Sequence, residues 1–409
     1  MNKRLAVTGN SGPKVRSDCQ TELELTDDGG IVIELQSKVQ VLYGESIKNQ
    51  CLEILDFFGI RNAVLKITDS GALPFVISAR IEAVVKQVVD TVNEFLPEIR
   101  EDNKCPSKRD RFRFSRLYVP GNTPSMMINA GLHSADGIIL DLEDSVAPEK
   151  KDEARILVRN ALRQICFYGA ERMVRINQGE RGLKDLEYVI PHYANLILIP
   201  KCESSEEVKR VESKIHELRN LYHLYNEVYL MPIIESAAGV EMSFEIARSS
   251  DLIVAIAIGL EDLTADLGVT RTKEGSETLY ARARIVNAAK AAGIQPIDSV
   301  FSDVGDMEAL RLNVLSSKSL GFEGMGCIHP RQVPVVRQGF APGPEEIEKS
   351  KKIVLAYDEA RRNGLGVVAL GTKMIDQPVV VRAQRTVDLA IRLGLLPDNW
   401  KNDIPIETE

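Results

Sequence analysis

The chain has 409 residues, of which 44% are hydrophobic and 27% charged, and its formal net charge is −8. These values are typical of globular proteins, and at roughly 150 residues per domain they predict two to three domains. The longest apolar run is too short to cross a membrane, no basic stripe indicates a nucleic-acid partner, and the N-terminus lacks an apolar signal core, so we expect a cytoplasmic protein.

The N-terminal part predicts a small α+β domain. Segments 22–25 and 31–35 alternate like half-buried strands, 63–67 reads as a further strand, and 45–58 reads as an amphipathic helix. A second helix begins at Pro74, a residue suited to a first helical turn. Its apolar stripe predicts the face that packs on the core and contains Ile77, Ile81, Val84, Val85, Val88, Val92 and Phe95.

A charged segment follows this domain. Nine of the fourteen residues from 98 to 111 are charged, and Pro106 and Ser107 interrupt any helix. We therefore predict a linker over residues 99–113 that separates a domain of residues 1–98 from the rest of the chain.

Downstream, short apolar runs alternate with helical stretches, which predicts an α/β fold. Eight such units suit a (β/α)₈ TIM barrel over residues 114–341, and a doubly wound open sheet is the alternative. No GxGxxG motif follows the first strand, which weakens a dinucleotide-binding interpretation. Residues 342–409 predict a C-terminal helical segment, with helices at 344–363 and 378–393. The predicted barrel strands are 116–119, 137–142, 173–176, 196–200, 229–234, 252–258, 296–301 and 324–328.

Polar side chains follow several of these strands directly. In a barrel, groups at the C-terminal ends of the strands converge on one rim, where active sites form. The set consists of Asp141, Glu143 and Asp144 after the second strand, Arg175 and Asn177 after the third, Lys201 after the fourth, Glu235 after the fifth, and Glu261 and Asp262 after the sixth.

Two of these carboxylates suggest a metal site. Glu235 and Asp262 end adjacent predicted strands and can hold one hard cation while leaving positions for water and substrate oxygens, as Mg²⁺ prefers. The six cysteines are scattered without a CxxC pair, so neither a zinc site nor a disulfide framework is indicated.

Six ordered motifs resemble the beta subunit of citrate lyase and its malyl-CoA and citramalyl-CoA lyase relatives. They are RLYVPGN at 116–122, ILDLEDSVAP at 139–148, VRIN at 174–177, IES at 234–236, GLEDL at 259–263 and KMIDQP at 373–378. The resemblance covers about residues 114 to 395. It implies a Mg²⁺-dependent TIM barrel, a homotrimer or hexamer, and a C-terminal helical lid that covers a neighbouring subunit's site.

The resemblance also implies a reaction and residue roles. The reaction is retro-Claisen cleavage of a 3-hydroxy-3-carboxyacyl thioester of the citryl-, citramalyl- or malyl-CoA type into an acetyl thioester and a 2-oxo acid. Glu235 and Asp262 would hold Mg²⁺, and Arg175, with Tyr118 and Glu235, would bind substrate. Asp376 of a neighbouring subunit would transfer the proton, although capping the helix near Pro378 is its alternative role. Metal-bound water would be oriented by the carboxylates of Asp141, Glu143 and Asp144.

The N-terminal domain resembles the acyl carrier (gamma) subunit of the same lyase. The matching motifs are IEL at 33–35, DSGAL at 69–73 and ARIEA at 79–83. That family attaches phosphoribosyl-dephospho-CoA to a serine two positions before an aspartate. Here the aspartate is Asp18 and the aligned residue is Arg16, so either Ser17 takes over attachment with a one-residue shift, or the domain carries nothing.

A second departure concerns free CoA. Citramalyl-CoA lyases have two lysines after the first-strand loop, where Ser125 and Asn129 stand here. We therefore expect free CoA to bind more weakly, because charge-assisted phosphate contacts are the strong ones. Three alternatives therefore stay open. The first alternative is a citryl-carrier lyase component that works with a CoA-transferase subunit. The second is a Mg²⁺-dependent pyruvate aldolase, and the third is a non-catalytic scaffold for an acyl carrier.

Overall fold

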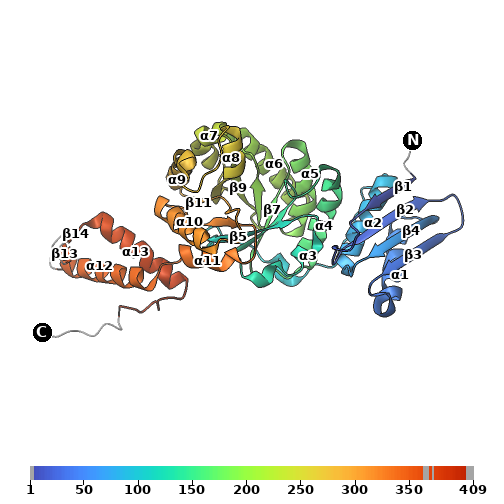
Figure 1. Ribbon diagram of the computed structural model, residues 1–409, viewed down its shortest axis with the longest axis horizontal. Coiled ribbons are helices and arrows are strands. Elements are labelled where there is room, and N and C mark those ends of the chain that lie inside the picture. Colours follow the sequence, from blue (N-terminus) through green and yellow to red (C-terminus); the bar gives the residue numbers. More distant parts are fainter. Residues whose placement is uncertain (1–3, 363–367, 371–372, 402–409) are drawn as a thin grey trace. The chain divides into compact units, whose positions relative to one another are not determined.

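The computed structural model describes residues 4–362, 368–370 and 373–401 (Figure 1). The chain divides into two compact units, Met1–Val333 and Pro334–Glu409. The first unit contains both the N-terminal sheet and the barrel, which the sequence separates into two domains. The division falls eight residues before the predicted end of the barrel at residue 341.

The N-terminal region is a four-stranded sheet covered by two helices. The strand order is β1-β2-β4-β3, in which β3 and β4 are parallel and the other pairs are antiparallel. The first strand was not predicted, and the first helix begins five residues earlier than predicted. The elements are β1 (Leu5–Thr8), β2 (Cys19–Leu25), β3 (Ile31–Ser37), α1 (Gln40–Phe57), β4 (Ala63–Asp69) and α2 (Pro74–Val88).

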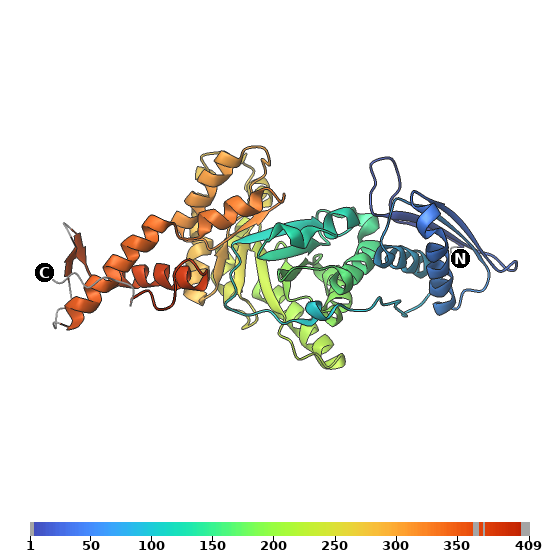
Figure 2. The ribbon, with the colours of Figure 1, turned by 90° about the horizontal axis from the view of Figure 1, so that it is seen from below.

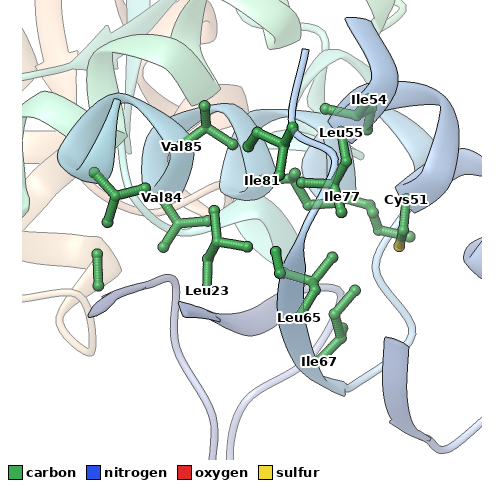
Figure 3. Close-up of a cluster of buried hydrophobic side chains, with 14 of the residues drawn as sticks. Leu23, Cys51, Ile54, Leu55, Leu65, Ile67, Ile77, Ile81, Val84 and Val85 are labelled. Atoms are coloured by element: carbon green, nitrogen blue, oxygen red, sulfur yellow. The ribbon is translucent and has the colours of Figure 1, made fainter. Parts of the chain in front are cut away.

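The core of this region forms between α2 and the sheet (Figure 3). Ile77 and Ile81 of α2 are buried against Leu65 of β4 and other apolar side chains, as the stripe predicts. The predicted stripe is wrong at Val92, whose exposed fraction is 92%. The chain leaves the helix after Val88 in an extended conformation, so the 3.6-residue period no longer places Val92 on the core.

Buried arginines join α2 to α4 (Lys151–Gln164) of the barrel. Arg80 donates from Nε and Nη2 to both carboxylate oxygens of Asp18, each at 2.9 Å, and its Nη1 lies 3.1 Å from Glu153 Oε1. Arg159 of α4 is paired with Glu82 of α2 at 2.7 Å. Both arginines are fully buried, so the N-terminal region is packed on the barrel through desolvated ion pairs.

The charged segment 99–113, predicted as a linker, is packed against the barrel. Arg113 is fully buried and donates to both carboxylate oxygens of Glu171, at the start of the third barrel strand, each at 2.8 Å. Asn103 is buried as well and donates to main-chain carbonyls at the end of α4. In this segment Arg109 and Arg113 bind groups more than 50 residues away in the sequence, which a local charge pattern does not reveal.

Eight parallel strands form the predicted barrel. Their order is β11-β10-β9-β8-β7-β6-β5-β12, and a parallel bridge between Asp298 and Met325 links the two ends. This closure confirms the barrel and excludes the open sheet. The strands are β5 (Ser115–Pro120), β6 (Gly137–Asp141), β7 (Glu171–Arg175), β8 (Leu196–Ile199), β9 (Tyr229–Ile234), β10 (Ala255–Ile258), β11 (Gln295–Ile297) and β12 (Met325–Cys327).

Helices surround these strands (Figures 1 and 2). Ser204 and Ser236 cap α6 and α7, because each hydroxyl accepts a main-chain N–H of the first turn. Inside the barrel, Ile139, Met173 and Met231 belong to one apolar cluster. Beside α4, the barrel helices are α3 (Pro124–Met127), α5 (Gly179–Val189), α6 (Ser205–Leu221), α7 (Ala237–Ala247), α8 (Leu260–Asp266), α9 (Leu279–Ala292) and α10 (Met307–Leu320).

The second unit contains two packed helices. Val354 of one and Val387 of the other are buried in a common cluster with Trp400. Part of the expected loop, including Gly364 to Gly366, lies outside the described residues. No helix among the described residues is long and apolar enough to span a membrane. The elements from α11 on are α11 (Gln332–Phe340), α12 (Pro344–Arg362), β13 (Val368–Leu370), β14 (Lys373–Ile375) and α13 (Gln377–Arg392).

Candidate active site

A cavity of about 500 Å³ opens at the C-terminal ends of the barrel strands. The structure brings most of the sequence-predicted site residues into its wall. They come from different strands: Tyr118 from β5, Asp141 from the end of β6, Asp144 from the following loop, Arg175 from the end of β7, Glu235 from the residue after β9, and Asp262 from α8.

Arg175 is held by the acidic loop after β6. Its Nε and Nη2 donate to the two carboxylate oxygens of Asp141 at 2.6 and 2.7 Å, and its Nη1 lies 3.0 Å from Glu143 Oε2. Burial by itself raises the pKa of Asp141, but the hydrogen bonds and charge of Arg175 outweigh it and lower that pKa. The guanidinium also lies 5.4 Å from the ring centroid of Tyr118, within cation–π distance. Arg175 is therefore charged and fixed in orientation.

Lys201 is a site residue to which the sequence assigned no role. Its ammonium lies 2.8 Å from Glu143, 3.1 Å from Asp144 and 3.9 Å from Asp262. Its main-chain N–H donates to Glu235 Oε2 at 2.8 Å. Lys201 has a positive φ of 48°, an uncommon conformation for a residue other than glycine. Its position directly after a buried apolar strand was the only signal in the sequence.

Glu235 is buried, with an exposed fraction of 6%. Burial is the main cause that raises the pKa of Glu235 to about 7, and the Asp262 charge adds to it, while the Lys201 N–H and Arg175 oppose it. Gly259 is required beside this carboxylate, because a Cβ atom there would lie 2.5 Å from Glu235 Oε1. The protein groups around Glu235 therefore do not fully stabilise its charged form.

The donor set fits a hard divalent cation. Glu235 and Asp262 both line the cavity, together with the carboxylates of Asp141, Asp144 and Glu261. Within the described part of the chain, no cluster of three or more Asp, Glu, His or Cys side chains forms a preassembled metal cage. A site with two protein ligands leaves the other coordination positions to water and substrate, as Mg²⁺ chemistry requires.

Two predicted functional residues belong to other parts of the chain. Asp376 belongs to the second unit and caps α13, because its Oδ1 accepts the Val379 N–H at 3.3 Å. Ser17 belongs to the N-terminal region, has a φ of 56° and donates its N–H to the Ser70 carbonyl. Ser125 and Asn129, where two lysines were expected for free CoA, are exposed.

Comparison with known proteins matches two parts of the chain. Residues 115–330 match the model of the HpcH/HpaI aldolase/citrate lyase family, and residues 8–88 match an ACP model described as malonate decarboxylase delta subunit. The second match supports the resemblance of the N-terminal region to an acyl carrier.

Individual proteins match as well. Citrate lyase subunit beta of Escherichia coli is 36% identical over 70% of this chain and 96% of its own length. Human mitochondrial citramalyl-CoA lyase is 34% identical over 67% of this chain and 85% of its own length. The crystal structure of CitE from Mycobacterium tuberculosis in complex with magnesium, acetoacetate and coenzyme A is 29% identical, with a TM-score of 0.58, and the match covers 69% of this chain and 99% of that one.

These matches span the strands, the acidic loop after β6 and the carboxylates of the cavity. The chain therefore belongs to the HpcH/HpaI aldolase/citrate lyase family, and the carbon–carbon lyase class expected from its motifs is confirmed.

Proposed function

We propose that the chain is a Mg²⁺-dependent lyase that cleaves a 3-hydroxy-3-carboxyacyl-CoA thioester into acetyl-CoA and a 2-oxo acid. The convergence of Glu235, Asp262 and the clamped Arg175 on one cavity carries this proposal. Similar structures contain magnesium with coenzyme A or with 2-oxo acids such as pyruvate, which supports the same chemistry here.

Each of these residues has a distinct role. Glu235 and Asp262 hold Mg²⁺, which when bound supplies a Lewis acid for the substrate oxygens. Arg175 is held by Asp141, and its charge stabilises the negative charge that develops on the thioester oxygen as the carbon–carbon bond breaks. Tyr118 packs against the Arg175 guanidinium and forms part of the substrate-binding wall.

Proton transfer is assigned to Asp376 of a neighbouring subunit in a homotrimer or hexamer. The chain's own Asp376 lies in the second unit, at the start of α13. A carboxylate there can exchange a proton with the substrate hydroxyl or the enolate carbon. In this proposal the oligomer completes the site, and the reaction takes place in the cytoplasm.

The N-terminal region is proposed to be a fixed lobe. A carrier that swings needs a solvated attachment to its enzyme, whereas Arg80 and Arg159 join this region to α4 through buried ion pairs. The alternative is an acyl group tethered to Ser17 through phosphoribosyl-dephospho-CoA and supplied by a CoA-transferase subunit. Intact-protein mass spectrometry separates them, because only the tethered mechanism requires added mass that the Ser17→Ala variant loses.

The direct test is a turnover assay of the purified full chain with citryl-CoA, citramalyl-CoA and malyl-CoA. We expect acetyl-CoA release with Mg²⁺ and none with EDTA. No release from any of the three thioesters, together with unmodified Ser17, would overturn the proposal.

A further inference from the structure

Arg116 is a buried arginine inside the barrel. It lies on β5, two residues before Tyr118, and its exposed fraction is 1%. Its Nη1 lies 3.0 Å from the sulfur of Met231 on β9. In the order of the sheet β9 is four strands from β5, so in an eight-stranded barrel it forms the opposite wall. The side chain of Arg116 therefore spans the barrel interior.

Glycines are paired with Arg116 on both neighbouring strands. In the register of the sheet, Arg116 is paired with Gly137 of β6 on one side and with Gly326 of β12 on the other. Neither glycine adds a side chain at this level of the barrel. Arg116 is thus the only one of these three paired residues that projects a side chain.

The charge of Arg116 has no acidic partner within the described residues. No carboxylate lies within ion-pair distance, and its Nε is buried without a hydrogen-bond partner. Burial lowers the pKa of Arg116 to about 10. By contrast, the buried Arg80 and Arg113 each bind both oxygens of a carboxylate. An unpaired buried guanidinium is costly to folding, which suggests that it has a partner that the protein does not supply.

The unpaired group faces the active-site cavity. Arg116 lines the same cavity of about 500 Å³ as Tyr118, Glu235 and Asp262. The carboxylate that acts electrostatically on Arg116 is Asp298, which lines the same cavity and is already paired with Arg282. An anion that enters the cavity would therefore meet Arg116 as its free cationic partner, and a carboxylate matches the planar fork of a guanidinium.

We propose that Arg116 binds a second carboxylate on the 2-oxo-acid half of the substrate. It would thereby select thioesters that release a dicarboxylic 2-oxo acid, such as citryl-CoA, over those that release pyruvate, such as citramalyl-CoA. This inference rests on the proposed function, and it adds a specificity-determining residue to that function.

The test compares the ratio of kcat/KM for citryl-CoA to that for citramalyl-CoA in the full-length protein with Mg²⁺. In Arg116→Met this ratio falls by about 10²-fold, because a charge-assisted contact to the second carboxylate is lost. Arg116→Lys keeps the charge without the fork and loses part of the preference. Arg172→Met is the matched control, because Arg172 is also buried but donates to main-chain carbonyls and does not line the cavity.

Product binding separates a failure of this inference from a failure of the proposed function. We expect oxaloacetate to bind the wild-type protein with Mg²⁺ at least about tenfold more tightly than pyruvate, and Arg116→Met to bind both equally. This measurement requires neither turnover nor a folded variant, since the wild-type comparison alone decides. Any one of three results would overturn the inference. They are equal affinities of the wild-type protein for the two acids, a wild-type preference for citramalyl-CoA, and an unchanged kcat/KM ratio in a folded Arg116→Met protein.

Discussion

Asp141 binds the guanidinium of Arg175 in a two-point contact, Nε to Oδ1 at 2.6 Å and Nη2 to Oδ2 at 2.7 Å. Both residues are at the C-terminal ends of adjacent parallel strands, β6 and β7. The contact leaves Nη1 as the remaining edge of the guanidinium and directs it toward the acidic loop after β6. Asp141 thus positions Arg175 and needs no contact with substrate itself.

Replacing Asp141 with Asn should reduce turnover without abolishing metal dependence. The amide keeps the shape of the side chain but offers only one acceptor oxygen, so one of the two contacts to Arg175 is lost. We expect kcat/KM to fall by about tenfold or more, on the scale of one charge-assisted hydrogen bond. Asp144→Asn is the control, because its contact to Arg175 is longer, at 3.3 Å, and more exposed. An equal effect of both variants would contradict the positioning role.

Asp376→Asn separates catalysis from helix capping. Asn is as good an N-cap as Asp, so the cap of α13 and the thermal stability should be retained. Turnover should fall by about 10²-fold, the scale of general acid–base catalysis. Asp376→Ala should lose turnover and also destabilise the protein by about 1 kcal/mol through loss of the cap. Wild-type turnover of Asp376→Asn would leave Asp376 with only the capping role.

A mixing experiment tests whether Asp376 acts on a neighbouring subunit. Alone, the Glu235→Gln protein should be inactive, and the Asp376→Asn protein should keep only about a hundredth of the wild-type turnover. After subunit exchange, some sites combine an intact barrel from one variant with an intact Asp376 from the other, so activity should return. A mixture that stays inactive despite demonstrated exchange would place Asp376 in its own subunit's site or outside the mechanism.

Arg80→Met should strongly destabilise the first unit. The substitution leaves Asp18 and Glu153 buried without their cation, and breaking a buried ion pair in this way typically costs about 3–5 kcal/mol. Arg61→Met is a matched control, because Arg61 forms an exposed pair with Asp56 that should contribute less than about 1 kcal/mol. Urea denaturation measures both. Similar free energies of unfolding for the two variants would argue against a rigidly fixed lobe.

The stability of the metal-free protein should fall as pH rises from about 4.5 to 7. Burial raises the pKa of Glu235 to about 7 in the folded state, whereas the ordinary value is 4.5. The folded state therefore keeps a proton that the unfolded state has lost, and each pH unit in this window costs at most about 1.4 kcal/mol of unfolding free energy. This contribution is fully present below 4.5 and lost above 7.

Urea titrations in EDTA at several pH values check this slope. Glu235→Gln cannot titrate and should flatten it, whereas Glu261→Gln, at an exposed position, should not. Parallel pH profiles for wild-type and Glu235→Gln proteins would contradict the raised pKa.

The sequence predicts the barrel well because most of its strands contain a short apolar run, and several of these runs are followed by a polar residue. The same signal locates Asp141, Arg175 and Glu235 at the rim of the cavity. It fails for β1, whose four residues form a strand only through pairing with β2. It also fails for the segment 99–113, because Arg113 is neutralised by Glu171, 58 residues further along the chain.

The roles of Lys201 and Arg116 depend on distances across the barrel. Lys201 follows a strand as other rim residues do, but its contacts to Glu143 and Asp262 come from the loop after β6 and from α8. Arg116 precedes an apolar run and has the local pattern of a strand boundary, yet it is buried against the opposite wall. No local pattern in the sequence predicts either arrangement.

We propose that Glu235 holds the metal on which thioester cleavage depends. Acetyl-CoA release by the wild-type and Glu235→Gln proteins, measured side by side with Mg²⁺ and with EDTA, tests it most directly. We predict Mg²⁺-dependent release by the wild-type protein alone, with Glu235→Gln inactive under both conditions although folded. Mg²⁺-stimulated release by Glu235→Gln at the wild-type rate would contradict the account.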